Sequence, residues 1–250
     1  MALKEILAHQ HEANKGLPLC TEVLLPSDRS FLKALRHSVC RPAVIAELKP
    51  KSPAAGMLAQ ADYQPAVQAR CYEEGGAVAV SVLTESHYFG GSFADLTVVR
   101  KAIHLPVLCK DFILDEQQVK WARYAGADAC LLIVAALNRD ELISLKSTIE
   151  ALNMLAVIEV HTLEELTLAL SIDPEIILIN NRNLWDLSMH PDTTRQLLPF
   201  IPRTLPVISA SGFTSPEEIR ALPDRVTAVL IGSQLMREGD PRLFLKALQS

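Results

Sequence analysis

From residue 43 onward, the sequence repeats one pattern eight times: a short apolar run typical of a buried strand, then a segment with helical spacing of its apolar residues. The predicted strands are Ala43–Leu48, Ala77–Leu83, Pro106–Lys110, Ala127–Ile133, Met154–Val160, Glu175–Ile179, Leu205–Ser209 and Ala228–Ile231. The predicted helices are Tyr63–Glu74, Phe93–Ala102, Glu116–Ala125, Arg139–Leu152, Leu163–Ser171, Thr193–Phe200, Pro216–Leu222 and Pro241–Leu248. Uniformly apolar strands that alternate with helices belong to a covered parallel sheet, and eight units favour closure into a (β/α)8 TIM barrel.

An N-terminal extension precedes the first predicted strand. Two short helices are expected there, Ala2–Asn14 and Ser30–His37, with Gly16-Leu17-Pro18 breaking the first. No change of composition suggests a second domain, so we expect a single domain over residues 1–250, with an extension at 1–42 and a barrel at 43–250. The glycine fingerprint GxGxxG of a dinucleotide-binding fold is absent after the first strand.

Composition and charge exclude several classes of protein. The sequence contains no run of eighteen apolar residues and no secretory segment within Met1–Gln10, so we expect a cytoplasmic protein without membrane contact. A net charge of −5 gives no general electrostatic reason to bind nucleic acid. The five cysteines show no CxxC spacing, which fits reduced thiols, and we predict neither a metal site nor a cofactor.

Polar residues gather at the ends of the predicted strands, which is where barrel enzymes hold their active sites. Because side chains alternate along a strand, Glu47 and Lys49 share one face, as do Asn180 and Arg182. If that face is the barrel interior, the polar side chains converge. The strand-end residues are Glu47, Lys49, Ser81, Lys110, Glu159, Asn180, Arg182, Ser211, Gly212, Gly232 and Ser233.

Lys110 is the most informative of these residues, because it ends an apolar run with no neutralising neighbour inside that run. A buried lysine is costly unless a negative group meets it. Taken singly, each strand-end residue has a structural explanation: an internal Glu47–Lys49 ion pair, a helix cap at Glu159, or a turn at Asn180. Their coincidence at the ends of separate strands favours one active site.

Glycine–serine steps indicate the class of ligand. Ser211-Gly212 follows the seventh predicted strand and Gly232-Ser233 the eighth, each before a helix-like segment. Barrels often bind phosphate through backbone N–H groups at these two places. We therefore predict a small phosphorylated substrate.

Several stretches resemble the indole-3-glycerol phosphate synthase family, in order across residues 43–236. They are Ala46–Pro53, Ser81–Glu85 with Tyr88–Ser92, Leu108–Ile113, Glu159–Thr162, Ile179–Leu184 and Ile231–Ser233. The resemblance implies a (β/α)8 barrel with an N-terminal extension. It also implies closure of the indole pyrrole ring from 1-(2-carboxyphenylamino)-1-deoxyribulose 5-phosphate, with loss of carbon dioxide and water, in tryptophan biosynthesis.

The resemblance also assigns roles. Lys110 would protonate the C2 carbonyl oxygen of the substrate, and Lys49 and Glu159 would supply the acid and base for dehydration. Glu47 and Asn180 would hold Lys49 and the substrate hydroxyls, Arg182 would bind the anthranilate carboxylate, and Ser211 is counted with the catalytic residues. The remaining substrate contacts would be Ser52, Gly212, Gly232 and Ser233 at the phosphate, Phe89, Phe112 and Leu131 beside the ring, and Ser81.

Three departures from the family pattern leave alternatives open. The seventh strand ends with Ala210 where the family usually has glutamate, Asn183 replaces an aspartate, and no Lys-x-x-Glu pattern appears in residues 9–15. The chain could be a weakly active or non-catalytic paralogue. It could instead be another phosphosugar barrel enzyme, either an isomerase or a Schiff-base aldolase, although an aldolase would need a neutral Lys110 in an apolar pocket. Association with other tryptophan-pathway enzymes is a further possibility.

Overall fold

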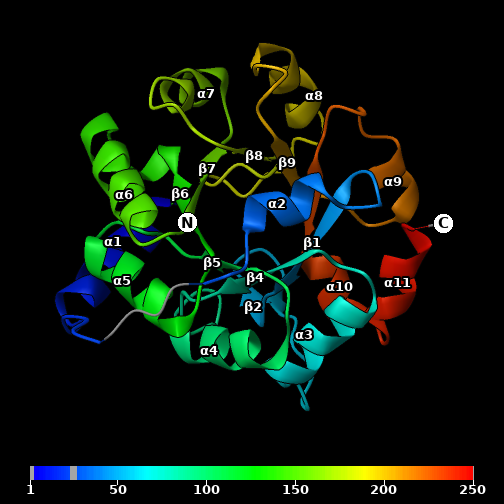
Figure 1. Ribbon diagram of the computed structural model, residues 1–250, viewed down its shortest axis with the longest axis horizontal. Coiled ribbons are helices and arrows are strands. Elements are labelled where there is room, and N and C mark those ends of the chain that lie inside the picture. The colour runs from blue at the N-terminus through cyan, green and yellow to red at the C-terminus, as the bar shows by residue number, and fades with distance from the viewer. Residues whose placement is uncertain (1–2, 23–26, 250) are drawn as a thin grey trace.

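The computed structural model describes residues 3–22 and 27–249 and is built around a closed barrel of eight parallel strands (Figure 1). Neighbouring strands pair in the order β1-β10-β9-β8-β7-β6-β5-β4, and β4 closes on β1. The barrel strands are β1 (Ala43–Leu48), β4 (Ala79–Leu83), β5 (Val107–Lys110), β6 (Ala129–Ile133), β7 (Leu155–Val160), β8 (Ile177–Asn180), β9 (Val207–Ala210) and β10 (Ala228–Ile231). The predicted TIM barrel is therefore confirmed.

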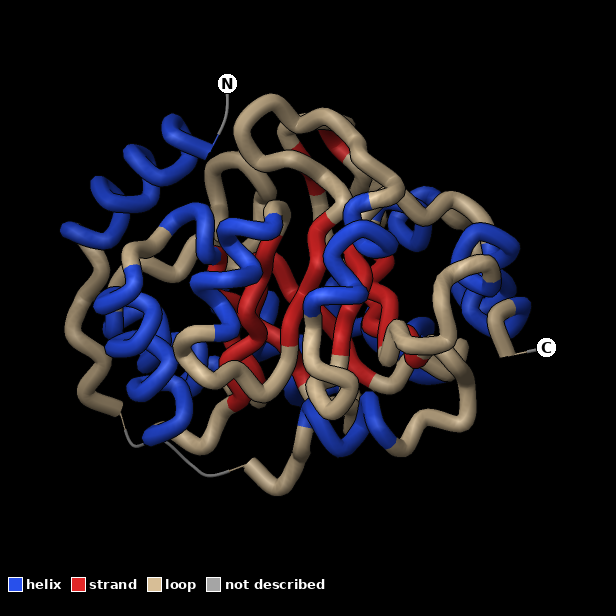
Figure 2. Tube along the Cα trace, turned by 90° about the horizontal axis from the view of Figure 1, so that it is seen from above, coloured by secondary structure: helices blue, strands red, loops and turns tan. Residues whose placement is uncertain are grey.

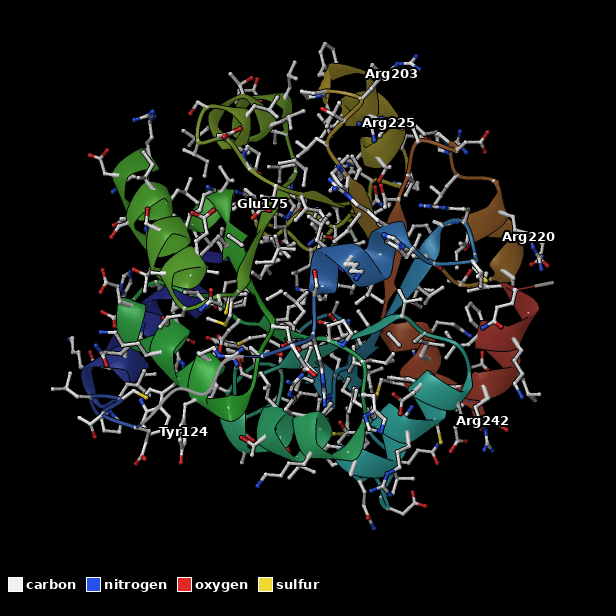
Figure 3. All side chains as sticks on the ribbon, in the orientation of Figure 1. Tyr124, Glu175, Arg203, Arg220, Arg225 and Arg242 are labelled. Atoms are coloured by element: carbon white, nitrogen blue, oxygen red, sulfur yellow. The ribbon has the colours of Figure 1, made fainter. Side chains whose placement is uncertain are left out.

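Helices surround the strands on the outside of the barrel (Figure 2). The helices that follow successive barrel strands are α3 (Pro65–Glu74), α4 (Phe93–Ala102), α5 (Glu116–Ala125), α6 (Arg139–Ala151), α7 (Leu163–Leu170), α8 (Thr193–Leu197), α9 (Pro216–Arg220), α10 (Ser233–Arg237) and α11 (Pro241–Ala247). Charged residues such as Arg203, Arg225 and Arg242 lie at the periphery, away from the barrel axis (Figure 3). No helix within the described ranges is long and apolar enough to span a bilayer.

The predicted elements agree with the observed ones to within two residues at almost every end. Two elements were not predicted: α10, and a small hairpin of β2 (Lys51–Ser52) with β3 (Gly56–Met57) in the loop after β1. Short 3₁₀ turns also occur at Val134–Ala136 and Leu198–Phe200. A two-residue strand carries too little periodicity to be recognised in a sequence.

The strands alternate between two apolar clusters. Outward side chains such as Val80, Cys109 and Ile158 pack against the helices, whereas inward side chains such as Ile45 and Leu108 fill the barrel. Continuing the inward alternation toward the carboxyl ends of the strands reaches Glu47, Ser81, Lys110, Ile133, Glu159, Asn180, Ala210 and Gly232. The strand period therefore places these residues inside one end of the barrel.

The two N-terminal helices pack against the same inner cluster. Helix α1 (Leu3–Lys15) buries Leu3 and Ile6, and the backbone N–H of Leu3 donates to the carbonyl of Leu184 at 2.9 Å, beyond β8. Helix α2 (Phe31–Arg36) begins at the Ser30 cap and buries Phe31 and Leu35 near the start of the barrel strands. The predicted extension is thus present, although Ala2 of the first predicted helix lies outside the described residues.

Candidate active site

A cavity of about 330 Å³ lies at the carboxyl end of the barrel. It brings together thirteen of the fifteen predicted site residues, contributed by strands β1, β5, β7 and β8 and by loops after β1, β4, β5, β8, β9 and β10. These are Glu47, Lys49, Ser52, Phe89, Lys110, Phe112, Glu159, Asn180, Arg182, Ser211, Gly212, Gly232 and Ser233.

One wall of the cavity is formed by the end of β1. Lys49 Nζ lies 2.8 Å from Glu47 Oε1, and Glu47 Oε2 is buried without a hydrogen-bond partner among the described residues. A Cβ atom at position 232 would overlap Glu47 Oε1 and come within 3.1 Å of Lys49 Nζ. The ion pair can therefore pack against the loop after β10 only because residue 232 is a glycine.

The opposite wall carries Lys110 and Glu159. Lys110 Nζ lies 3.8 Å from Glu159 Oε2, and the side-chain amide of Asn180 donates to Glu159 Oε1 at 3.0 Å. The backbone N–H of Arg182 donates to Asn180 Oδ1 at 3.0 Å, which turns the amide so that its NH₂ group faces the carboxylate. Asn180 thereby fixes the orientation of Glu159.

Glu159 is held as an anion despite complete burial. Burial by itself acts to raise the pKa of this carboxyl group. The ammonium of Lys110, the imidazole of His161 and the amide of Asn180 outweigh that effect and lower the pKa to about 2. The group is consequently ionised, and able to accept a proton, across the neutral range.

Asp111, beside Lys110, shows the opposite behaviour. Burial raises the pKa of Asp111 to about 6, although Thr84 Oγ1 donates to its Oδ2 at 2.5 Å and the backbone N–H of Phe112 donates to Oδ1 at 2.8 Å. Two neutral donors do not compensate for complete desolvation of the carboxylate.

Arg182 is suited to bind a carboxylate. Its Nη1 atom donates to the carbonyl of Leu187 at 2.8 Å, which anchors one edge of the guanidinium, and partial burial lowers its pKa. Within the described residues, no carboxylate lies at ion-pair distance from Arg182. A planar cation that lines a cavity without a counter-ion can take an anionic group of a ligand in bidentate geometry.

The loop after β9 adopts an unusual backbone conformation. Ser211 and Gly212 both have positive φ angles, 70° and 94°. Asn181 holds this loop: its side-chain NH₂ donates to the carbonyls of Ala210 and Ser211, at 3.0 and 3.1 Å, and the N–H and Oγ1 of Thr194 donate to its Oδ1. The side chain of Asn181 thus couples β8 to the predicted phosphate loop, a role that the sequence analysis did not predict.

Two aromatic rings line the cavity from neighbouring loops. Phe89 and Phe112 have ring centroids 6.1 Å apart. The carboxylate of Glu85 accepts hydrogen bonds from the backbone N–H groups of His87, Tyr88 and Phe89, which fixes the loop that presents Phe89.

The structure places two predicted contacts away from the cavity. Ser81 and Leu131 are fully buried and do not line it; Leu131 lies one inward position deeper along β6, and Ile133 takes the lining position. Apolar lining that the sequence analysis missed comes from Ile6 in α1 and from Leu184 and Leu187 after β8. The spacing of apolar residues marks Ile6 as buried but gives no sign of what it packs against.

Comparisons with known proteins agree with the geometry. The model of the family "Indole-3-glycerol phosphate synthase" matches residues 3–248. A protein of that name from Acidithiobacillus ferrooxidans is 42% identical over 250 residues, covering 96% of this chain and 95% of its own. One from Kineococcus radiotolerans is 46% identical over 203 residues, covering 80% of this chain and 73% of its own.

Among solved structures, thiamine phosphate pyrophosphorylase from Pyrococcus furiosus superposes with a TM-score of 0.60 at 16% identity, covering 83% of this chain and 94% of that chain, and this likeness concerns the fold alone. The family match spans nearly the whole sequence, and the two relatives described above carry the same name. The chain belongs to the indole-3-glycerol phosphate synthase family.

Proposed function

We propose that the cavity closes the pyrrole ring of indole-3-glycerol phosphate from 1-(2-carboxyphenylamino)-1-deoxyribulose 5-phosphate, with Lys110 as the first acid. The ring carbon that bears the carboxylate attacks the C2 carbonyl carbon of the sugar, and the carbonyl oxygen takes a proton from the Lys110 ammonium. Lys110 suits this role because Glu159, which forms an ion pair with it among the described residues, lies at 3.8 Å. That distance leaves the ammonium able to turn toward a ligand.

Loss of carbon dioxide then restores an uncharged ring system, and dehydration completes the reaction. Dehydration removes the C2 hydroxyl as water and a proton from the adjacent carbon, so it needs an acid and a base. Lys49 is the proposed acid and Glu159 the proposed base. After Lys110 has given up its proton, Glu159 loses part of the positive field that lowers its pKa, and it becomes a stronger base at the step that requires one.

Binding is divided among three parts of the cavity. Arg182 takes the anthranilate carboxylate, and Phe89 and Phe112 flank the aromatic ring. The phosphate is assigned to Ser52, Gly212, Gly232 and Ser233, where glycines let the backbone approach a ligand closely. Ser211 lines the cavity next to Gly212, and Glu47 orients Lys49.

The observation that carries the proposal is the convergence of Lys49, Lys110, Glu159 and Arg182 on one cavity. The test is a fluorescence assay for indole-3-glycerol phosphate with the wild-type chain, Lys110→Met and the exposed control Lys101→Met. We expect turnover in wild type and control, and a loss of about 10³-fold in kcat for Lys110→Met. No product from the wild type would overturn the function, and full activity of Lys110→Met would overturn the acid assignment.

We also infer a cytoplasmic location and an association with other enzymes of tryptophan biosynthesis. Both follow from the biosynthetic family. Fractionation of cells that produce the tagged chain, followed by identification of co-purifying proteins, tests each of them.

A further inference from the structure

Three barrel strands end with the same arrangement, an oxygen-bearing side chain followed two residues later by a cationic or titratable one. The pairs are Glu47 with Lys49 on β1, Glu159 with His161 on β7, and Asn180 with Arg182 on β8. Lys49 and Arg182 line the cavity, but His161 does not. Its ring is instead directed to helix α7 and lines a second, outer pocket.

His161 lies between two carboxylates. Its Nε2 atom is 3.3 Å from Glu159 Oε1, an ion-pair contact without hydrogen-bond alignment, and its Nδ1 atom is 3.0 Å from Glu165 Oε2. The backbone N–H of His161 donates to the same Glu165 oxygen at 2.7 Å. Glu165 therefore fixes the ring from the α7 side, and the other ring nitrogen remains directed at Glu159.

We propose that His161, as an imidazolium, is a positioning residue that keeps Glu159 ionised and so sets the lowest pH at which Glu159 can act as the base. This inference rests on the base role proposed above for Glu159. His161 touches neither the cavity nor the substrate, and it acts through the carboxylate that does line the cavity.

The electrostatic surroundings support a charged ring. Burial acts to lower the pKa of His161, but the carboxylates of Glu159 and Glu165 outweigh it and raise the pKa to about 9. The other titratable groups that line the outer pocket with His161 are His190 and Asp192, from the segment after β8. Lys110, at the end of β5, lies near Glu159 Oε2, whereas His161 lies near the other carboxylate oxygen, Oε1.

The outer pocket gives the ring a route to solvent that is separate from the mouth of the barrel. It lies between the loop after β7 and the segment that leads into α8, and Thr162 and Met189 also line it. His161 can therefore exchange its proton with water while a substrate fills the inner cavity. Glu159 itself is completely buried and has no such route of its own.

The first test compares pH profiles of kcat/KM for the full chain and its variants with the ribulose 5-phosphate substrate. His161→Leu removes the cation, and His161→Gln keeps a neutral amide donor. In both variants, we expect the acid limb of kcat/KM to move upward by one pH unit or more. Glu165→Gln is the matched control: it keeps an oxygen acceptor for the His161 N–H but removes the outer charge, so a smaller shift in the same direction is expected.

A purely structural role for His161 gives a different result. Lower thermal stability combined with a normalised pH profile that superposes on the wild type would overturn the proposal. Rescue of the acid limb by His161→Gln would equally show that the hydrogen-bond donor, and not the positive charge, is what matters.

The second test needs no turnover. Imidazole ¹⁵N signals of His161, assigned by their loss in His161→Gln, should report a doubly protonated ring at pH 7 in the wild-type chain. In Glu159→Gln, the midpoint of that titration should fall by at least one unit. A neutral His161 at pH 7 overturns this inference even if the enzyme is active. Absence of product from the wild type overturns the proposed function, and the ¹⁵N spectra then still decide whether His161 and Glu159 interact electrostatically.

Discussion

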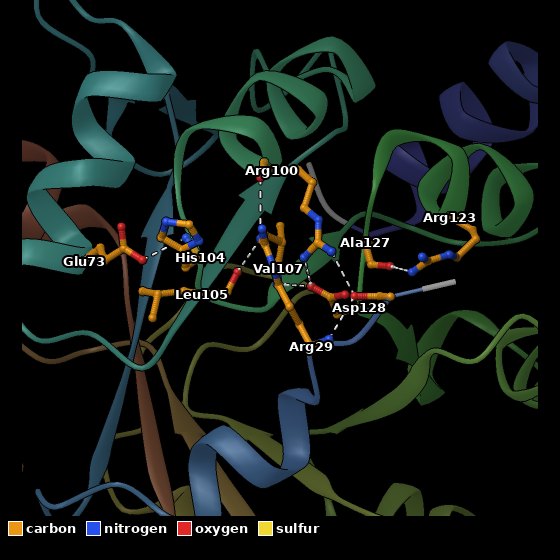
Figure 4. Close-up of polar contacts among 10 residues, drawn as sticks. Arg29, Glu73, Arg100, His104, Leu105, Val107, Arg123, Ala127 and Asp128 are labelled. Atoms are coloured by element: carbon orange, nitrogen blue, oxygen red, sulfur yellow. Dashed lines mark hydrogen bonds and ion pairs between the residues drawn. The ribbon is translucent and has the colours of Figure 1, made fainter. Parts of the chain in front are cut away.

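At the carboxyl end of the barrel, two lysine–glutamate pairs lie on the walls of a cavity, whereas at the amino end three arginines surround the buried Asp128 (Figure 4). Arg100 Nη1 and the backbone N–H of Val107 both donate to Asp128 Oδ2 at 2.9 Å. Arg29 donates to the carbonyl of Leu105 at 3.0 Å, and Arg123 to that of Ala127 at 2.5 Å.

The amino-end cluster ties segments together. Its guanidinium groups bind backbone carbonyls as well as the carboxylate, and they bridge the chain before α2, helix α4 and the starts of β5 and β6. Among the described residues, each lysine at the other end forms one ion pair with a carboxylate, and a ligand can compete for that lysine. A lysine can also give up its proton near neutral pH when its surroundings change, which an arginine cannot.

The two ends of the barrel therefore use different cations, lysine at the proposed reaction site and arginine at the cluster that stabilises the fold. Lysine with glutamate occurs where we propose that protons are transferred, and arginine with aspartate occurs where a permanent charge joins the starts of neighbouring strands. The two ends should respond to equally conservative substitutions in different ways.

The largest effect is expected from Lys110→Arg at the carboxyl end. The substitution keeps the positive charge opposite Glu159 but replaces a proton donor with a group that stays protonated. We expect kcat to fall by about 10³–10⁴-fold, about 5 kcal/mol in the barrier, with little change in melting temperature. Steady-state assays with calorimetry on the same sample measure both quantities, and near-normal kcat would show that charge alone suffices at this position.

The next effect is expected from Asp128→Asn at the amino end. The side chain of Asp128 is completely buried, so loss of its charge leaves Arg100 without its counter-ion. We expect the free energy of unfolding to fall by about 4 kcal/mol, because one partner of a buried pair has been removed. Urea unfolding measures the loss, and kcat/KM at 25 °C should stay within about twofold of wild type. A large loss of activity in a folded sample would contradict the division between the two ends.

The carboxyl-end half of this comparison could be predicted from the sequence, for a physical reason. The strand period of two fixes which side chains face inward, so Glu47, Lys110 and Glu159 could be assigned to one cavity from their places at strand ends. The depth of a residue inside the barrel could not be predicted the same way. Leu131 pairs with Val157 one inward layer below Glu159, and that register is set by pairing between strands and not by the sequence of either.

Contacts between segments that lie far apart in the chain could not be predicted from the sequence either. Nothing near Asn181 in the sequence indicates that it binds the loop after β9, and nothing near Ile6 indicates that α1 reaches the cavity. The Arg29–Arg100–Asp128 cluster draws on three separate elements in the same way. Such contacts form only when the barrel closes, and the sequence around each residue does not indicate which distant segment it will contact.

Asp111, another buried carboxylate, sharpens the comparison because it has hydroxyl and backbone donors where Glu159 and Asp128 have cations. Its pKa in the folded chain is raised from 3.8 to about 6, so the unfolded chain ionises first as pH rises. Its contribution to stability is greatest below pH 3.8 and is lost as pH rises through 6, a change of about 3 kcal/mol.

The variant Asp111→Asn isolates this effect. The stability of wild type relative to the variant should fall by about 2.5 kcal/mol between pH 4 and pH 7, as measured by urea unfolding at several pH values. Thr84→Val, which removes the hydroxyl donor, should raise the Asp111 pKa further and move the same transition to higher pH. A difference between wild type and Asp111→Asn that does not change with pH would mean that Asp111 is ionised throughout.

The smallest effect is expected from Ala210→Glu, which adds a carboxylate to the cavity. Ala210 lines the cavity at the inward end of β9 and pairs with Asn180 of β8. Among the described residues, each lysine of the site has one carboxylate within ion-pair distance, so an added carboxylate would favour the protonated form that a proton donor requires. We expect kcat to rise by about fivefold, about 1 kcal/mol, with Ala210→Gln as the uncharged control of equal size. An equal gain in both variants would assign the effect to packing. A loss in Ala210→Glu alone would mean that Glu47 and Glu159 already neutralise the two lysines, so that an added carboxylate draws one lysine away from the substrate.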